Sequence, residues 1–285
     1  MSIIKPTFIF IGPGRSATTW IYSALKMHPE IGLAKSTKET SYFTSEFWRG
    51  EEWYLNHFCA HENKISIGEV CNEYIYNPLV AHRIKEALPE VKLIAVLRNP
   101  LERIWSVYHY RKRRGGVYSN ITHAIGKDHD LLANNYYWDL LRPYYECFNS
   151  DQIKIFFYDD LVEDSGLFLD KIFVELGVEK LERGSVKQGK INKTESLRFS
   201  FFGKIASYVA DRLREADLLG TLLYLKESRL VKFFLYGKGA TKDTEKFPLE
   251  LQKEIIDALA KDIEKLSKLT GRDLQSWLEP IKKLA

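Results

Sequence analysis

The feature that most constrains the fold is an apolar stretch near the N-terminus that ends in a glycine-rich turn. Residues 8–11 are all apolar, and residues 12–14 read Gly-Pro-Gly. After the turn, Ile21, Ala24 and Leu25 recur at helical spacing. The sequence therefore predicts a buried strand, a tight turn and a helix. The backbone amides of such a turn meet the helix N-terminus, which makes a binding site for a phosphate-sized anion.

This turn differs from the loop of nucleoside-triphosphate-binding proteins, which reads G-x-x-x-x-G-K-[ST]. Ala17 and Thr18 stand where that motif has its Gly-Lys pair, so the lysine that reaches the β and γ phosphates is missing. Arg15 instead supplies a charged, planar set of donors inside the loop. The residues predicted to form the anion site are Gly14, Arg15, Ser16, Ala17, Thr18, Thr19 and Trp20.

A second buried strand is predicted to end at an arginine. Residues 91–97 form a nearly continuous apolar run, typical of a strand buried on both faces of a parallel sheet. Arg98 follows, and Pro100 suits the first turn of a helix. Ligands of open α/β sheets bind at the carboxyl ends of the strands, so Arg98 is a candidate binding residue. Ser106 lies two turns into the predicted helix and can point back toward the same site.

Both segments resemble motifs of the sulfotransferases that use 3′-phosphoadenosine 5′-phosphosulfate (PAPS). The loop around Arg15 is similar to their K/R-x-G-T-T/S motif, with Ala17 where the family usually has glycine. The segment from Arg98 to Ser106 matches their R-N-P-x-x-R-x-x-S pattern. Shorter similarities follow in the same order along nearly the whole chain. They resemble the bacterial, heparan-sulfate-type carbohydrate branch of the family.

The resemblance implies a role for each of these residues. Arg15 would bind the 5′-phosphosulfate together with the amides of residues 16–19. It would also offset charge on the leaving phosphate, which makes it catalytic as well as donor-binding. Arg98 and Ser106 would hold the 3′-phosphate. PAPS would be the co-substrate and adenosine 3′,5′-bisphosphate the product, and no metal is expected.

The catalytic base is predicted to be a carboxylate. Heparan-sulfate-type enzymes carry their catalytic glutamate shortly before an aromatic-Phe pair, and the corresponding residue here is Glu39. Glu73 and His109 stay open as alternatives. Without the resemblance, a loop glutamate such as Glu39 is more often a solvated group paired with Lys35 or Lys38.

The acceptor is expected to contact a small set of polar and aromatic residues. Lys38 is expected to steady the transferred sulfonate, and Glu73 to line the acceptor pocket. Aromatic side chains suit stacking on a sugar, a phenol or a polyketide-like alcohol. The aromatic candidates are Tyr136, Tyr42, Phe43, Tyr74, Tyr76, Tyr137 and Trp138.

Size and composition favour one catalytic domain over residues 1–285, because 45% of the chain is hydrophobic and no Gly-, Ser- or Pro-rich linker divides it. The resemblance implies a P-loop-like, three-layer α/β fold. A central, mostly parallel sheet would be flanked by helices, with a largely helical C-terminal addition. Residues 196–246 are expected to form an apolar, largely helical insertion. Ordinary helical core is its first explanation, and the alternatives are an acceptor lid, a dimer face or a membrane-surface contact. A late segment resembles the one that closes over the nucleotide, and its candidate donor-binding residues are Lys190 and Arg198.

Charge and cysteine content exclude several other classes. A net charge of +4, from 42 basic against 38 acidic residues, argues against a chain-wide surface for nucleic acid or another polyanion. The 3 cysteines and 7 histidines show no metal-ligand spacing. No signal peptide or spanning stretch is visible, so a cytoplasmic location is expected.

The sequence therefore predicts a sulfotransferase that moves a sulfuryl group from PAPS by in-line transfer with a carboxylate base. The acceptor would be a hydroxyl, with an amine as second choice, on a small molecule, a glycan or a carrier-tethered intermediate. The chain could act as a homodimer. Two alternatives stay open. One is a P-loop kinase or NTPase with an eroded phosphate loop, and the other is a non-catalytic nucleotide-binding protein.

Overall fold

Five parallel strands form the centre of the fold in the computed structural model, which describes residues 4–35, 37–181 and 245–285. Their order across the sheet is β2-β3-β1-β4-β5. The strands are β1 (Phe8–Gly12), β2 (Ile31–Leu33), β3 (Ser66–Val70), β4 (Lys92–Leu97) and β5 (Ile153–Phe157). In the middle of the sheet, Phe8 lies beside Gly68 of β3 on one side and Lys92 of β4 on the other. The two predicted buried strands are therefore neighbours, and their carboxyl ends reach the same edge.

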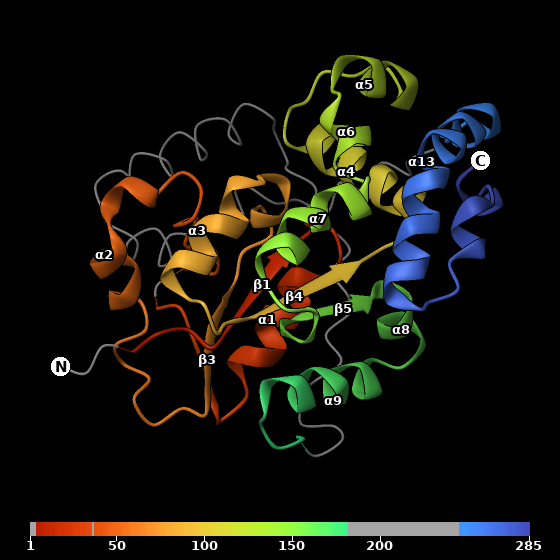
Figure 1. The fold of residues 1–285 in the computed structure, drawn as a ribbon. Coiled ribbons are helices and arrows are strands. Elements are labelled where there is room, and N and C mark those ends of the chain that lie inside the picture. Colours follow the sequence, from red (N-terminus) through yellow and green to blue (C-terminus); the bar gives the residue numbers. More distant parts are fainter. Residues whose placement is uncertain (1–3, 36, 182–244) are drawn as a thin grey trace, which may run out of the picture. The chain divides into compact units, whose positions relative to one another are not determined.

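Helices cover both faces of this sheet (Figure 1). Alternate residues of a strand point to opposite faces, and Phe8 and Phe10 of β1 face one layer of helices. That layer consists of α1 (Thr18–Lys26), α8 (Tyr158–Glu163) and α9 (Ser165–Leu176). The other layer contains α3 (Leu79–Ala87) and α7 (Tyr137–Cys147). The predicted α/β fold with a central parallel sheet flanked by helices is confirmed.

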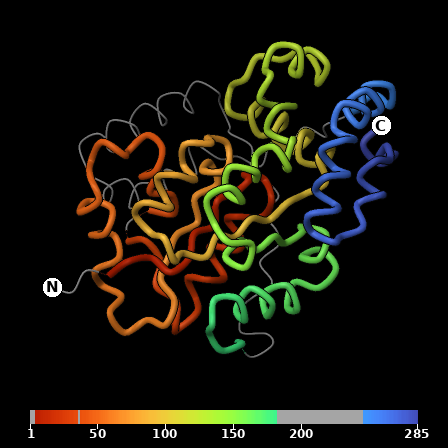
Figure 2. The backbone as a smooth tube through the Cα atoms, viewed as in Figure 1, coloured from red at the N-terminus to blue at the C-terminus, as the bar shows by residue number. Residues whose placement is uncertain are grey.

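The backbone runs from each strand through helical turns to the next strand (Figure 2), as parallel strands require. Between β2 and β3 this connection holds a helix, α2 (Glu51–Asn56). The described residues also form short 3-10 helices. Those between strands are η1 (Phe47–Arg49), η2 (Tyr74–Tyr76) and η3 (Ser150–Gln152), and those after the last strand are η4 (Gln275–Leu278) and η5 (Lys282–Leu284).

The chain divides into two compact units. The sheet belongs to the first, made of the described parts of residues 1–99, 136–191 and 261–274. The second contains the described parts of residues 100–135, 192–260 and 275–285. Its helices are α4 (Pro100–Arg113), α5 (Ile121–Lys127), α6 (Asp130–Ala133) and the first part of α13 (Leu249–Thr270). The predicted helical C-terminal region is confirmed, while the single catalytic domain stays a prediction.

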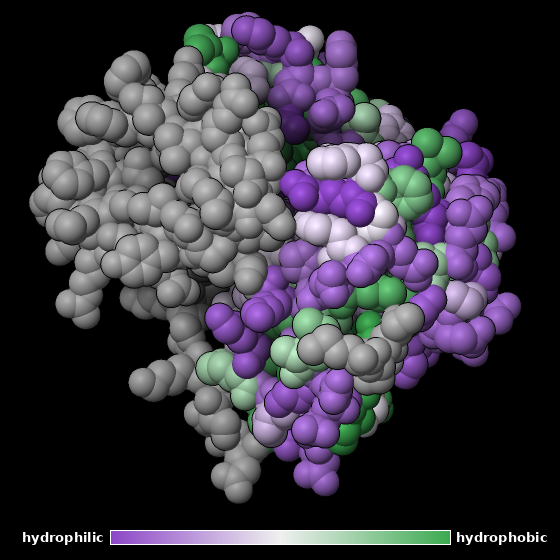
Figure 3. All heavy atoms as spheres, turned by 90° about the vertical axis from the view of Figure 1, so that its left-hand side faces the viewer, coloured by the Kyte–Doolittle hydropathy of each residue, from purple (hydrophilic) through white to green (hydrophobic). Residues whose placement is uncertain are grey.

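Several expectations fall on residues that the structure does not describe. Lys190, Arg198 and residues 196–244 of the predicted insertion lie outside the described residues. On the face drawn in Figure 3, the described surface is mainly hydrophilic, with apolar residues in small separate patches. Within the described ranges, no helix is long and apolar enough to cross a membrane.

Candidate active site

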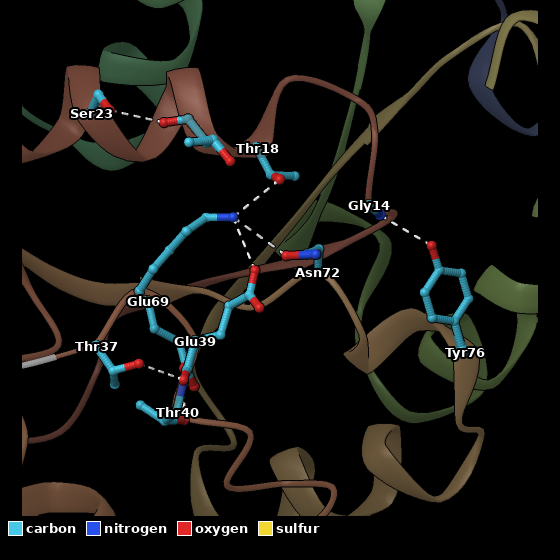
Figure 4. Close-up of polar contacts among 11 residues, drawn as sticks. Gly14, Thr18, Ser23, Thr37, Glu39, Thr40, Glu69, Asn72 and Tyr76 are labelled. Carbon is cyan, nitrogen blue, oxygen red and sulfur yellow. Dashed lines mark hydrogen bonds and ion pairs between the residues drawn. The ribbon is translucent and has the colours of Figure 1, made fainter. Parts of the chain in front are cut away.

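The β1–α1 loop (residues 13–17) folds tightly against the segment that follows β3. The backbone N–H of Gly14 donates a hydrogen bond to the hydroxyl of Tyr76 at 3.0 Å (Figure 4). Gly12, with φ of 115°, lies so close to Asn72 that a Cβ would meet its carbonyl oxygen at 2.6 Å. Only glycine therefore allows this approach. Arg15 and Ala17 have φ of 71° and 61°, in the left-handed region. At position 17 the resembled motif usually has glycine, which adopts this conformation freely.

The loop leads into a helix N-terminus that suits an anion. Ala17 is the N-cap of α1 and makes no side-chain capping bond, and the first turn of the helix holds no acidic residue. Ser16 is fully buried, and its hydroxyl has no hydrogen-bond partner among the described residues. A buried unpaired hydroxyl is costly, so an oxygen-rich ligand in this loop would give it the missing partner. The predicted site residues from Gly14 to Trp20 thus lie in this loop and in the first turn of α1.

Lys38 connects this loop with the predicted base. Its Nζ donates to the Oγ1 of Thr18 at 3.2 Å, to the Oε1 of Glu39 at 2.9 Å and to the Oδ1 of Asn72 at 3.4 Å (Figure 4). The Glu39 side chain is 36% exposed, so its carboxylate stays open to a bound molecule. One ammonium therefore lies between the first turn of α1 and a partly exposed carboxylate.

Arg98 packs against the same loop from the end of β4. Its Nη1 donates to the carbonyl oxygen of Arg15 at 3.3 Å, and its guanidinium lies 4.3 Å from the ring centre of Tyr158. The hydroxyl of Tyr137 donates to the carbonyl oxygen of Arg98 at 2.8 Å. The strand-end arginine and the β1–α1 loop are thus brought together. Ser106 belongs to α4 in the second unit, so its pairing with Arg98 stays a prediction.

Glu69 is a buried carboxyl next to the segment of Glu39, and the sequence did not single it out. This carboxyl is fully buried in β3, and it accepts hydrogen bonds from Thr40, Tyr54 and Tyr74. Burial raises its pKa to about 7 against the lowering effect of those bonds. The signal in the sequence was a glutamate inside an otherwise uncharged strand, Ser66–Val70, where a charge needs partners.

The expected acceptor-stacking role is wrong for most of the aromatic residues. They are at most 3% exposed, so no acceptor can lie against their rings; these are Tyr42, Phe43, Tyr74 and Tyr137. Tyr42 and Phe43 pack on Tyr54, and Tyr76 holds the β1–α1 loop. The hydroxyls of such tyrosines find partners inside the protein, which lets the rings be buried.

The other candidate residues are placed as follows. Tyr136 is half-buried and precedes α7. Glu73, also half-buried, accepts a hydrogen bond from the Thr44 hydroxyl. His109 is buried in α4, with its ring 4.2 Å from that of Trp105. Their roles in the site stay predictions.

A parallel sheet with a glycine-rich loop after its central strand and a strand-end arginine beside that loop is a P-loop-like fold. The family model described as the sulfotransferase domain matches residues 5–206, and the chain belongs to the sulfotransferase family. The matching family is one of sulfotransferases and not of kinases.

Curated relatives agree with this assignment. A membrane-associated sulfotransferase, kil1, of Dictyostelium discoideum is 38% identical over 45% of this chain and 29% of its own length. The bifunctional heparan sulfate N-deacetylase/N-sulfotransferase 4 of Mus musculus is 26% identical over 61% of this chain and 22% of its own. The chain thus spans less than a third of the length of these relatives.

Solved structures show the same fold. A sulfotransferase from Alicyclobacillus acidocaldarius superposes with a TM-score of 0.69. The match covers 97% of this chain and 100% of that one at 17% identity.

Proposed function

We propose that this sulfotransferase transfers a sulfuryl group from PAPS to a nucleophile of a glycan-like acceptor, with Glu39 as the base. The observation that carries the proposal is the Lys38 ammonium, which lies within hydrogen-bond distance of both Thr18 in the anion site and the Glu39 carboxylate. In-line transfer needs one positive group where the donor and acceptor sides meet, because negative charge develops there. Lys38 is proposed to be this group.

Residues of the β1–α1 loop fit the phosphosulfate end of PAPS, which supplies an activated sulfuryl group when bound. The buried Ser16 hydroxyl lacks a partner, and the uncapped N-terminus of α1 offers amides to phosphate oxygens. Arg15 is proposed to offset the charge left on the phosphate, and Arg98, with Ser106, to hold the 3′-phosphate. Lys190 and Arg198 remain proposed donor-binding residues from the sequence alone.

Glu39 is proposed to take the proton of the acceptor as the new bond to sulfur forms. Its carboxylate is partly exposed and held by Lys38, so it is oriented and open to solvent at once. Lys38 then stays beside the transferred group and stabilises its oxygens. Glu73 and Tyr136 are proposed to line the acceptor side.

The acceptor group is either a hydroxyl or an amine. The sequence favours a hydroxyl, whereas relatives named heparan sulfate N-sulfotransferases favour an amine. A polymer of glucuronate and glucosamine with free amines separates the two when compared with its N-acetylated form, because both carry the same hydroxyls. Radiolabel from [35S]PAPS on the free-amine polymer alone supports an amine acceptor. Label on both supports a hydroxyl, and label on neither overturns the glycan-like acceptor.

Calorimetric titration tests the donor first. We expect adenosine 3′,5′-bisphosphate to bind, and Arg98→Ala to weaken this binding at least tenfold, because hydrogen bonds to charged groups contribute about 1.5–3 kcal/mol. Binding of ATP with Mg²⁺ in place of the bisphosphate would overturn the proposed donor. A cytoplasmic location and a homodimer stay predictions.

A further inference from the structure

We propose that Glu69 is a positioning residue for the loop of residues 37–43, and that taking up a proton there loosens this loop around Glu39. The inference rests on the proposed function, because Glu39 is the proposed base. Glu69 touches neither donor nor acceptor, so its effect passes through the backbone of the loop.

The first observation is that the Glu69 carboxylate is directly bonded to the loop. Its Oε2 accepts from the backbone N–H of Thr40 at 3.3 Å and from the Thr40 hydroxyl at 2.7 Å. Its Oε1 accepts from the hydroxyls of Tyr54 at 2.9 Å and Tyr74 at 3.1 Å. A carboxylate has about four acceptor positions, so all of them are used. Thr40 directly follows Glu39, which ties the proposed base to β3.

The second observation is that two further loop amides reach Glu69 through these hydroxyls. The backbone N–H of Tyr42 donates to the Thr40 hydroxyl at 3.2 Å. The backbone N–H of Phe43 donates to the Tyr74 hydroxyl at 3.4 Å. The backbone amides of residues 40, 42 and 43 are therefore all linked to the same carboxylate by hydrogen bonds, either directly or through one hydroxyl.

The third observation concerns charge. Among the described residues, the titratable groups facing Glu69 are Tyr54 from α2, Tyr74 from η2 and Cys71 after β3. Burial raises the pKa of each, and the Glu69 charge adds to this rise. All three groups are neutral, so burial has the largest effect on Glu69 and raises its pKa to about 7. A protonated Glu69 brings a hydrogen of its own among these donors. At least one hydroxyl must then turn its hydrogen away, which weakens the chain of bonds that holds the loop.

Hydrogen exchange of the ligand-free protein tests this between pH 6 and pH 8. The measured quantity is the protection factor of the amides of residues 40–43, corrected for the intrinsic pH dependence of exchange. We expect it to fall several-fold as the pH drops through about 7. Glu69→Gln should lower it at least tenfold at pH 8 and remove its pH dependence, since glutamine does not titrate.

Two further variants keep the test decisive if Glu69→Gln folds poorly. Tyr54→Phe removes one bond that favours the charged carboxylate, so the midpoint of the protection change should move to higher pH. Glu46→Gln is the matched control, because Glu46 bonds Arg49 and Ser45 and should leave both the protection and its midpoint unchanged. Protection that is independent of pH in the wild type, or unaltered by Tyr54→Phe, overturns the proposal.

Turnover adds a readout that a purely structural role would not move. With [35S]PAPS and the polymer that accepts label, Glu69→Gln should lower kcat at least tenfold with KM for PAPS within threefold. The acid limb of the wild-type kcat profile near pH 7 should disappear in the variant. Binding of adenosine 3′,5′-bisphosphate is measured separately. If neither the donor binds nor transfer occurs, the proposed function fails; if only the exchange and pH effects are missing, Glu69 has no positioning role.

Discussion

Ser16→Ala should change stability and ligand affinity in opposite directions. Ser16 is 0% exposed, so its hydroxyl cannot bond to solvent, and this hydroxyl has no hydrogen-bond partner among the described residues. Leaving such a hydroxyl unsatisfied costs about 1–3 kcal/mol. Alanine removes the hydroxyl and leaves a gap of one atom, so we expect the ligand-free variant to gain about 1 kcal/mol. For a chain of this size that corresponds to roughly 2–4 °C in Tm.

The same substitution should weaken binding of adenosine 3′,5′-bisphosphate. A hydroxyl that donates to a charged phosphate oxygen contributes about 1.5–3 kcal/mol, which is about a tenfold to a hundredfold change in Kd. Thermal unfolding with and without the bisphosphate measures both effects on one sample. The ligand-induced rise in Tm should shrink while the ligand-free Tm increases. A lower ligand-free Tm, or an unchanged Kd, would show that the Ser16 hydroxyl does not bind a ligand oxygen.

Three more substitutions test the site and its loop. Lys38→Met should lower kcat by about 10²–10³-fold, as loss of one transition-state donor does, and calorimetry should show an unchanged affinity for the bisphosphate. Lys35→Met is the control, because Lys35 is exposed. An unchanged kcat in Lys38→Met would exclude the proposed role of Lys38. Gly12→Ala should destabilise the protein by more than about 2 kcal/mol, because its Cβ would lie 2.6 Å from a backbone oxygen at a φ of 115°. Ala17→Gly should be neutral or stabilising by up to about 1 kcal/mol, because φ is 61° there and glycine adopts that conformation without strain. Chemical denaturation measures the free energy of unfolding of Gly12→Ala and Ala17→Gly. Equal losses of stability in the two variants would contradict this account.

Local sequence patterns predicted the parts of the fold that depend on residues close together in the sequence. Strands buried on both faces are mostly apolar, and β1 and, apart from Lys92, β4 carry that signature. Gly12 and Gly14 mark the turn because Asn72 comes close to both, with its backbone at Gly12 and its side chain at Gly14. The strand-end position of Arg98 followed from the same reasoning, and the structure brings it to the carbonyl oxygen of Arg15.

Contacts between distant segments could not be predicted in this way. Lys38 reaches Thr18 only because β2 and β1 end at the same edge of the sheet, with β3 between them. The tyrosines were harder still, because a buried and an exposed tyrosine look alike in a sequence. Tyr74 could be expected to face an acceptor, yet its hydroxyl donates to Glu69 and its ring is fully buried.

The two carboxylates of this site differ in what compensates their charge. Glu39 is paired with the ammonium of Lys38 and remains partly in water, so its charge is held without full desolvation. Glu69 is fully buried and is bonded only by neutral donors in the contacts described above. A buried cation at Glu69 would hold its charge more firmly, but would bring a second desolvation cost. Neutral donors avoid that cost and leave the pKa near 7, so the loop beside Glu39 is anchored by a group that can change its charge under physiological conditions.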